Sequence, residues 1–194
     1  MFNIPAYEPM LNAPNNVTHG IWIIRGVGSS SITGTFTIPY GVYKIWRTVV
    51  AGGGGSVGST GNGGDGTNSF FGDLIATFGA KSTSVSNGAG GSPNGMSGLN
   101  ILNALGVGLS LGVGGSTPFG NAGNTTAVGY GSGAGSANNN IDQAYGAGSG
   151  GWYYRESLNV VQGMVFDAVA GAGGVAGAGV GGGTGAPGIV IIEW

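Results

Sequence analysis

The side chains of this 194-residue chain that could perform chemistry are few and far apart. His19 is the single histidine and no cysteine occurs, so the sequence holds no cluster of the usual zinc ligands. Two carboxylates could still meet in space as an acid–base pair, but no spacing indicates one. The seven carboxylates are separated along the chain, at Glu8, Asp65, Asp73, Asp142, Glu156, Asp167 and Glu193. We therefore expect no enzymatic activity, no catalytic residue, no metal site and no cofactor.

Two glycine runs are the other candidates for chemistry, because glycine-rich loops can wrap phosphate groups. The first, residues 51–66, lacks the GxxxxGK[ST] pattern of a phosphate loop, and no helix-forming run follows it. Its glycines recur every third residue instead, at positions 52, 55, 58, 61 and 64. The second run, Gly171–Gly188, can be divided into three sets of residues, each set taking every third position. Two of these three sets consist mostly of glycine. This period predicts packed, extended chains with three residues per turn, of the polyglycine-II type.

Composition limits the remaining classes of function. Charged residues make up only 6% of the chain and hydrophobic residues 41%, which indicates a folded rather than a disordered protein. The net charge is −2, and the five lysines and arginines form no basic patch, so we expect no nucleic-acid partner. No apolar run approaches the ~18 residues of a membrane span, so we expect no membrane insertion.

Alternating apolar residues and turn signals predict strands along most of the chain, and no window shows a capped helical period. Residues 72–73 form a predicted turn inside one strand pair, and residues 161–163 join another two strands. The predicted segments are Gly20–Val27, Thr35–Ile38, Tyr43–Val50, Thr67–Phe78, Ala104–Val113, Trp152–Val160, Met164–Ala170 and Ile189–Trp194. The expected fold is all-β: a glycine-rich β-sandwich-like domain with polyglycine-II-type segments and no significant helix.

The order of these segments resembles the glycine-rich domain at the distal end of the tail fibres of tailed bacteriophages. Pro39-Tyr40-Gly41-Val42 stands where that family has its first turn, and Asn68-Ser69-Phe70-Phe71-Gly72 stands, with an insertion, where it has a Thr-Ser-Phe-Gly unit. Ala170-Gly171-Ala172-Gly173-Gly174 and the ending GAPGIVIIEW match its last segments, whereas residues 161–163 replace its Pro-Gly turn. More loosely, the chain is similar to the separate glycine-rich tip adhesins of T-even-like phages.

This resemblance implies a tail-fibre tip protein that adheres to a receptor on the bacterial surface: a polysaccharide, a pilus or an outer-membrane protein. It implies a location at the distal tail fibre of the virion, after synthesis in the host cytoplasm. Residues 1–34 would be an attachment arm with the first strand, contacting other fibre or baseplate proteins, and residues 35–194 the receptor-binding domain. The alternative is a structural fibre, spike or cap subunit that mediates trimerisation and assembly. An ice-binding or silk-like protein ranks lower, because only two stretches have a clean period of three.

Receptor contacts are expected on loops, since a glycine lattice has little side-chain chemistry of its own. Three loops are rich in Asn, Ser, Thr and Tyr, which suit adaptable recognition: Ser92–Asn103, Ser116–Thr126 and Ser136–Tyr145. The candidate receptor-binding residues are Phe119, Asn138, Asn139, Asn140, Asp142, Tyr145 and Trp152. Trp152–Tyr154 could stack on the sugars of a receptor, or they could pack in the core as part of a strand. Asn138–Asn140 could bind the receptor, or they could form a turn that is exposed to solvent. The resemblance to fibre tips, which are commonly trimers, implies a homotrimer, and an unpaired edge at Gly188–Trp194 would invite pairing between chains.

Overall fold

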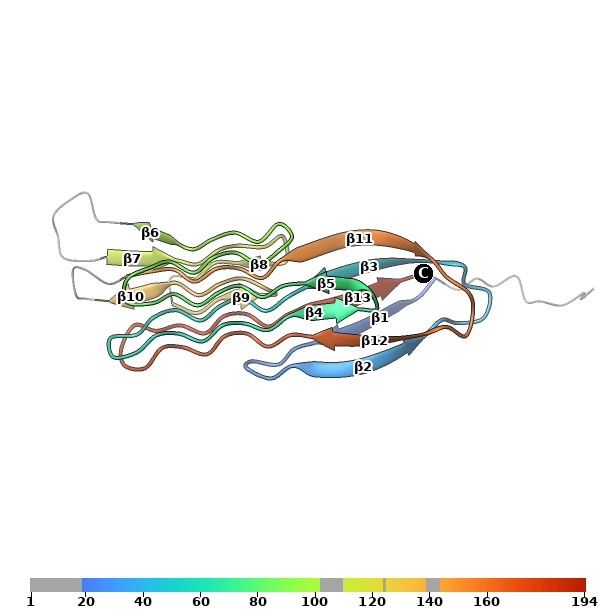
Figure 1. Cartoon of the computed structure of the whole chain (residues 1–194), viewed down its shortest axis with the longest axis horizontal. Coiled ribbons are helices and arrows are strands. Elements are labelled where there is room, and N and C mark those ends of the chain that lie inside the picture. The colour runs from blue at the N-terminus through green and yellow to red at the C-terminus, as the bar shows by residue number, and fades with distance from the viewer. Residues whose placement is uncertain (1–18, 102–109, 124, 139–143) are drawn as a thin grey trace, which may run out of the picture.

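Two four-stranded antiparallel sheets, here called the sandwich, form one end of an elongated molecule (Figure 1). The computed structural model describes residues 19–101, 110–123, 125–138 and 144–194. The first sheet contains, in order, β1 (Ile21–Arg25), β13 (Ile189–Glu193), β3 (Lys44–Val50) and β11 (Trp152–Asn159). The second sheet contains, in order, β2 (Ile32–Thr37), β12 (Val165–Ala170), β4 (Ser69–Phe71) and β5 (Leu74–Ala76).

A side-chain core fills the space between these two sheets. Because successive strand residues point to opposite faces, the alternate residues Ile45 and Val49 of β3 are both fully buried. Phe71 of β4 is also fully buried, with its ring centroid 6.2 Å from that of Phe36 and 5.0 Å from that of Phe166. The predicted all-β class is confirmed, and the described residues contain no helix.

The pairing of the strands differs from expectation at the end of the chain. The segment expected to present an unpaired edge contains β13, which lies between β1 and β3 and is hydrogen-bonded on both sides. It is therefore a central strand, and the argument for a trimer from that edge is wrong. In addition, β11 and β12 belong to different sheets, so residues 161–163 carry the chain across the sandwich. Gly163, with φ of 79°, makes that turn possible.

The glycine-rich segments extend from the sandwich as a bundle of hydrogen-bonded backbones, here called the glycine bundle (Figure 1). It is formed by residues 51–68, 77–98, 112–117, 131–135, 144–151 and 171–188. A Cβ atom on Gly52, Gly53 or Gly54 would overlap with the backbone of Ala172, Ser132 or Ala80, respectively. Three successive residues thus face three different neighbours, and each neighbour is too close for any side chain.

The hydrogen bonds of the first run repeat every three residues. Amides at every third position donate to the same neighbouring segment: Gly52, Gly55 and Gly58 to residues 61–67, and Gly53, Ser56 and Ser59 to residues 180–186. This repeat is the one expected of an extended chain with three residues per turn. The polyglycine-II assignment itself stays a prediction.

Both glycine runs reverse direction, which their period does not reveal. The second run turns back at residues 178–181, where Gly179 and Gly181 have φ of 86° and 89°. The first run turns back at residues 59–61, where Gly58 donates its amide hydrogen to Gly61. Gly171–Gly188 is therefore two arms joined by a turn rather than one uninterrupted extended element.

Short strands occupy the loops that were expected to carry the receptor contacts. A three-stranded sheet contains, in order, β10 (Ser136–Asn138), β7 (Ser110–Val113) and β6 (Leu99–Ile101). A two-stranded sheet contains β8 (Gly120–Asn121) and β9 (Val128–Gly129). The predicted strand Ala104–Val113 is present as β7 at its end, and its residues 104–109 lie outside the described residues.

The first two strands are part of the same sheets as the last two. β1 pairs with β13, and β2 pairs with β12 along its whole length. The division expected between residues 34 and 35 falls inside β2, and residues 1–18 lie outside the described residues. Within the described residues, no helix is long and apolar enough to cross a membrane.

Arg47 of β3 carries a charge into the sandwich and pairs with Asp73 of the β4–β5 turn. Nη1 of Arg47 lies 2.6 Å from Oδ1 of Asp73, and the two side chains are 7% and 78% exposed. The hydrogen bond from Arg47 holds the pKa of Asp73 below its ordinary value. Because this pKa is lowered by folding, the pair stabilises the protein above the unfolded-state pKa of Asp73. The stabilisation is lost as the pH falls through the folded-state pKa.

Asp73→Asn is expected to lower the free energy of unfolding at pH 7 by about 1–3 kcal/mol, because the buried guanidinium loses its charged partner. The deficit relative to wild type should shrink towards pH 2, because the pH then falls towards the lowered folded-state pKa of Asp73 and the carboxylate progressively loses its charge. Urea unfolding at both pH values measures this. Asp167→Asn, on the exposed side of β12, is the matched control. A deficit that is equal at both pH values would contradict the assignment.

Candidate functional site

The residues predicted to bind a receptor do not gather at one place. Asn139, Asn140 and Asp142 lie outside the described residues. Asn138 ends β10, opposite Ser110 of β7. Tyr145 is half-buried in the glycine bundle, where its carbonyl group accepts a hydrogen bond of 2.8 Å from Oγ of Ser82.

Phe119 and Trp152 lie instead near the junction of the bundle with β11. Trp152 is half-buried, and its amide donates to the carbonyl oxygen of Pro93 at 2.8 Å. Tyr153 packs against the core of the sandwich, whereas Tyr154 is exposed and lies 6.0 Å from Phe119 between ring centroids. The three consecutive aromatic residues thus do not share one stacking surface, and the exposed Tyr154 pairs instead with the half-buried Phe119.

The turns at the end of the glycine bundle that is farthest from the sandwich are called the tip here (Figure 1). Residues of these turns line a polar hollow. Its volume is about 330 Å³, and its lining carries no charged residue. The hollow is lined by Val57, Gly58, Ser59, Thr60, Gly61, Asn62 and Ser84. Oδ1 of Asn62 accepts from the amide of Ser84 at 3.1 Å, and Oγ of Ser59 accepts from the amide of Val180 at 3.0 Å. These bonds hold three separate turns together.

The sequence did not predict the tip, because the period of three through Gly58, Gly61 and Gly64 indicated one uninterrupted extended segment without a turn. The available signal was the polar interruption Ser59-Thr60-Gly61-Asn62 within the run. Thr60 and Ser84 are exposed, and the hydroxyl groups and amide at the tip can donate and accept hydrogen bonds. The tip is therefore suited to a neutral, hydrogen-bonding ligand.

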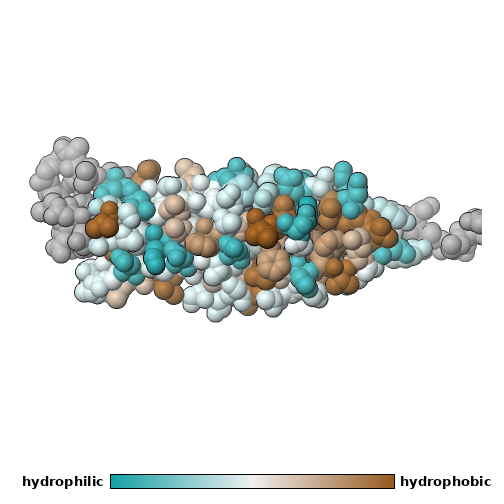
Figure 2. Space-filling model, in the orientation of Figure 1, coloured by the Kyte–Doolittle hydropathy of each residue, from teal (hydrophilic) through white to brown (hydrophobic). Residues whose placement is uncertain are grey.

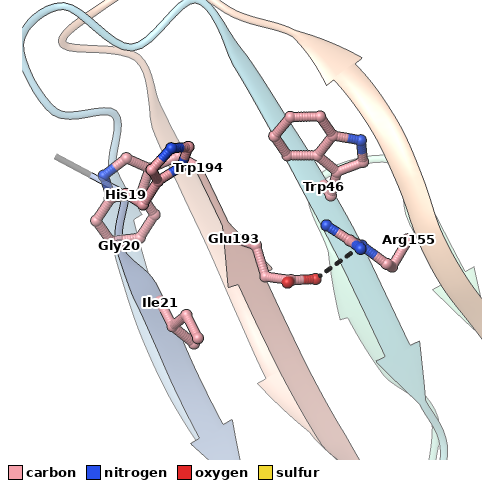
Figure 3. A pocket seen from close by; sticks show the side chains of 7 residues that line it. All are labelled: His19, Gly20, Ile21, Trp46, Arg155, Glu193 and Trp194. Carbon is pink, nitrogen blue, oxygen red and sulfur yellow. Dashed lines mark ion pairs between the residues drawn. The ribbon is translucent and has the colours of Figure 1, made fainter. Parts of the chain in front are cut away.

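A second hollow, of about 350 Å³, lies on the outer face of the first sheet at the sandwich end (Figure 3). It is lined by His19, Gly20, Ile21, Trp46, Arg155, Glu193 and Trp194. Nε of Arg155 lies 3.2 Å from Oε2 of Glu193, and its guanidinium carbon lies 5.7 Å from the centroid of the Trp46 ring. Nζ of Lys44 lies 5.5 Å from the same ring. We call this site the Arg155 hollow.

The backbone of Arg155 is in a conformation that glycine adopts more readily. Its φ is 52°, at a bulge where β11 shifts register against β3 between Tyr153 and Glu156. Such strain costs about 1–3 kcal/mol. The partly exposed ion pair with Glu193 returns about 0.2–1 kcal/mol, and the contact with Trp46 about 0.5–1 kcal/mol. Local contacts therefore give little reason for an arginine at this bulge.

Comparison with known proteins supplies no further assignment: no protein-family model matches the sequence, and no curated protein matches it. Within the described ranges, no three His, Asp or Glu side chains lie close enough together to hold a metal ion. The two hollows are thus the candidate sites.

Proposed function

We propose that this protein is the tip of a bacteriophage tail fibre, located on the virion, and that it adheres to a receptor on the bacterial surface. The observation that carries the proposal is the polar tip, placed at the opposite end of the molecule from the point where the described chain begins and ends. Gly20 and Trp194 exchange two backbone hydrogen bonds of 3.0 Å at the sandwich end (Figure 1). One end is thus available for attachment and the other for recognition.

The distribution of apolar side chains supports this polarity. Hydrophobic residues gather most densely over the sandwich on the face seen in Figure 2. In the sandwich, Tyr40, Tyr43 and Val161 are exposed on the connections between the two sheets, and Val165 is exposed at the start of β12. Large exposed apolar residues are typical of surfaces that contact another protein. In this proposal the sandwich end meets fibre or baseplate proteins.

The proposal includes a role for the glycine bundle and an oligomeric state. The glycine bundle acts as a rigid polyglycine-II-type spacer between the attachment end and the tip. The protein assembles as a homotrimer, a proposal that rests on the resemblance to fibre tips alone. The mass in solution by light scattering at micromolar concentration tests it, and a monomer mass would contradict it.

The test of receptor binding is a double substitution at the tip, Thr60→Arg with Ser84→Arg. Both side chains are exposed, so the fold should persist, while two charged side chains would fill the polar hollow. We expect binding of the fluorescent protein to host cells to fall at least about tenfold. Competition with phage adsorption should fall in parallel.

Thr35→Arg with Ser29→Arg, at exposed positions of the sandwich, is the matched control. Binding that is lost equally in both double variants would argue against the tip. Combined alanine substitution of Asn139, Asp142 and Tyr145 tests the loop prediction in the same assay. A wild-type protein that assembles into particles but does not bind cells would favour the structural subunit.

A further inference from the structure

One edge of the sandwich is open to pairing with a further strand. β2 is the outermost strand of the second sheet and pairs only with β12 (Figure 1). Natural proteins usually protect such edges by keeping them short, by placing charges on them or by interrupting them with a bulge. β2 has six residues in unbroken register with β12, and residues 29–38 carry no charge. This edge therefore lacks all three protections.

The other three edges of the sandwich each have one of them. β5 has only three residues, and β11 is interrupted by the bulge at Arg155. β1 ends at Arg25, which is charged and exposed. β2 is thus the edge of the sandwich that best accepts an additional strand.

Alternate residues of β2 direct their amide and carbonyl groups away from β12. The amide of Ile38 donates to the carbonyl oxygen of Met164 at 2.8 Å, where the pairing of β2 with β12 continues past β2. Because inward and outward backbone groups alternate along an antiparallel edge strand, those of Thr33, Thr35 and Thr37 point outward. No other segment of the described chain accepts a hydrogen bond from these three amides. The edge therefore offers three donors and three acceptors in a row.

The side chains of β2 specify the pattern of the added strand. Ile32 lies on the same side of β2 as the buried Phe36, yet it is 38% exposed at the open edge. The threonines at positions 33, 35 and 37 line the opposite side and are exposed. Since neighbouring strands pack side chain against side chain, the matching strand alternates apolar residues beside Ile32 with polar residues beside the threonines.

The orientation of β2 favours a different protein over a second copy. β2 runs along the long axis of the molecule (Figure 1). Antiparallel pairing of two β2 edges about a two-fold axis would direct the two tips in opposite directions. An extended strand from a protein at the sandwich end leaves the tip free.

We propose that the fibre or baseplate protein that carries this chain adds an extended strand, with alternating apolar and polar residues, to the β2 edge. Strand addition of this kind takes its affinity from main-chain hydrogen bonds and its specificity from alternate side chains. The inference rests on the proposed function, in which the sandwich end is the attachment end, and it identifies the strand and the contacts that attach it.

Hydrogen–deuterium exchange on a peptide that covers residues 31–38 tests the proposal, with the full-length chain isolated and in purified phage particles. In the isolated chain the three outward amides should exchange as fast as in an unstructured peptide of the same sequence. In particles we expect them to exchange at least about tenfold more slowly. Equal rates in the two samples would overturn the proposal. Protection already present in the isolated chain would assign the edge to another part of that chain or, where it grows with concentration, to a second copy, and would also overturn it.

Thr35→Pro removes one outward amide and leaves the hydrogen bonds between β2 and β12 in place, so the fold should persist. We expect purified particles to contain at least about tenfold fewer copies of this variant than of wild type, as measured by immunoblot. Thr35→Val keeps the amide and is the matched control, which should be incorporated normally. Thr33→Lys with Thr37→Lys keeps every amide, places two charges on the edge, and should also reduce incorporation.

Normal incorporation of both the proline and the lysine variants would overturn strand addition. As isolated proteins, all three variants should bind host cells like wild type, because the tip lies at the other end. A wild-type chain that binds cells but shows no protection of β2 in particles would contradict this inference alone. A wild-type chain that is absent from particles and does not bind cells would contradict the proposed function together with this inference.

Discussion

Replacing Gly53 with alanine is expected to lower the free energy of unfolding by roughly 3 kcal/mol or more, and replacing it with valine is expected to prevent folding. A Cβ atom at this position would overlap with the carbonyl group of Ser132. That carbonyl is fixed, because it accepts a hydrogen bond of 2.9 Å from the amide of Ala186. A rotamer change cannot relieve a clash with the main chain. Chemical denaturation measures the alanine variant, and soluble yield measures the valine variant.

Gly61→Ala is the matched control within the same glycine run. Its Cβ would lie 3.3 Å from Cβ of Ala178, beside the exposed turn of the hairpin. We expect a change of less than about 1 kcal/mol, of either sign, because alanine also lowers the entropy of the unfolded chain. Equal denaturation midpoints for the two alanine variants would contradict the close-packed backbone.

The sequence alone suggests Gly179 and Gly182 as the positions where valine would abolish folding, and the structure distinguishes the two. A Cβ atom on Gly182 would overlap with the main-chain carbonyl group of Gly177. Gly179 lies in the exposed turn, where an added Cβ would first meet the hydroxyl group of Ser59, a side chain that can rotate. Its φ of 86° still disfavours valine. The period of three identifies which residues are glycine, but it does not show which of them face a fixed carbonyl group.

Strand positions could be predicted because their signals are local. The alternation of side chains in Lys44–Val50 and the Gly72-Asp73 turn between β4 and β5 each depend on only a few adjacent residues. Strand partners could not be predicted in this way. β13 lies between β1 and β3, which are more than a hundred residues away along the chain, and its apolar sequence fits an edge or a centre equally well.

The candidate sites depend even more on tertiary structure. Ser59 and Ser84 meet at the tip only because two hairpins end at the same level of the bundle. The positive φ of Arg155 arises at a bulge against β3, and nothing in the order of residues 152–159 marks it. Composition predicts recognition through hydroxyl and amide groups on turns, a hypothesis that stays untested, and it places those groups on loops later in the chain than the tip.

Phe71→Ala is expected to lower the free energy of unfolding by about 3–5 kcal/mol, because it removes a fully buried ring and leaves a cavity. Phe36 and Phe166 flank this ring from two other strands of the sandwich, so the cavity opens at the centre of the core. The matched control is Phe70→Ala, whose ring is half-buried on the opposite face of the same strand. Its expected cost is about 1 kcal/mol. A larger cost for Phe70 than for Phe71 would contradict the assigned core.

The same variant tests whether the sandwich and the glycine bundle unfold together. All four tryptophans lie in or next to the first sheet, so their fluorescence reports on the sandwich. Exchange of the buried amides of residues 52–58 reports on the bundle. β4 continues directly from the first hairpin, and Oγ of Ser69 accepts a hydrogen bond of 2.8 Å from the amide of Gly171 in the second run. We therefore expect Phe71→Ala to shift both probes by the same free energy, because the backbone lattice is anchored to the side-chain core. A shift seen by fluorescence alone would show that the bundle is stable without the core.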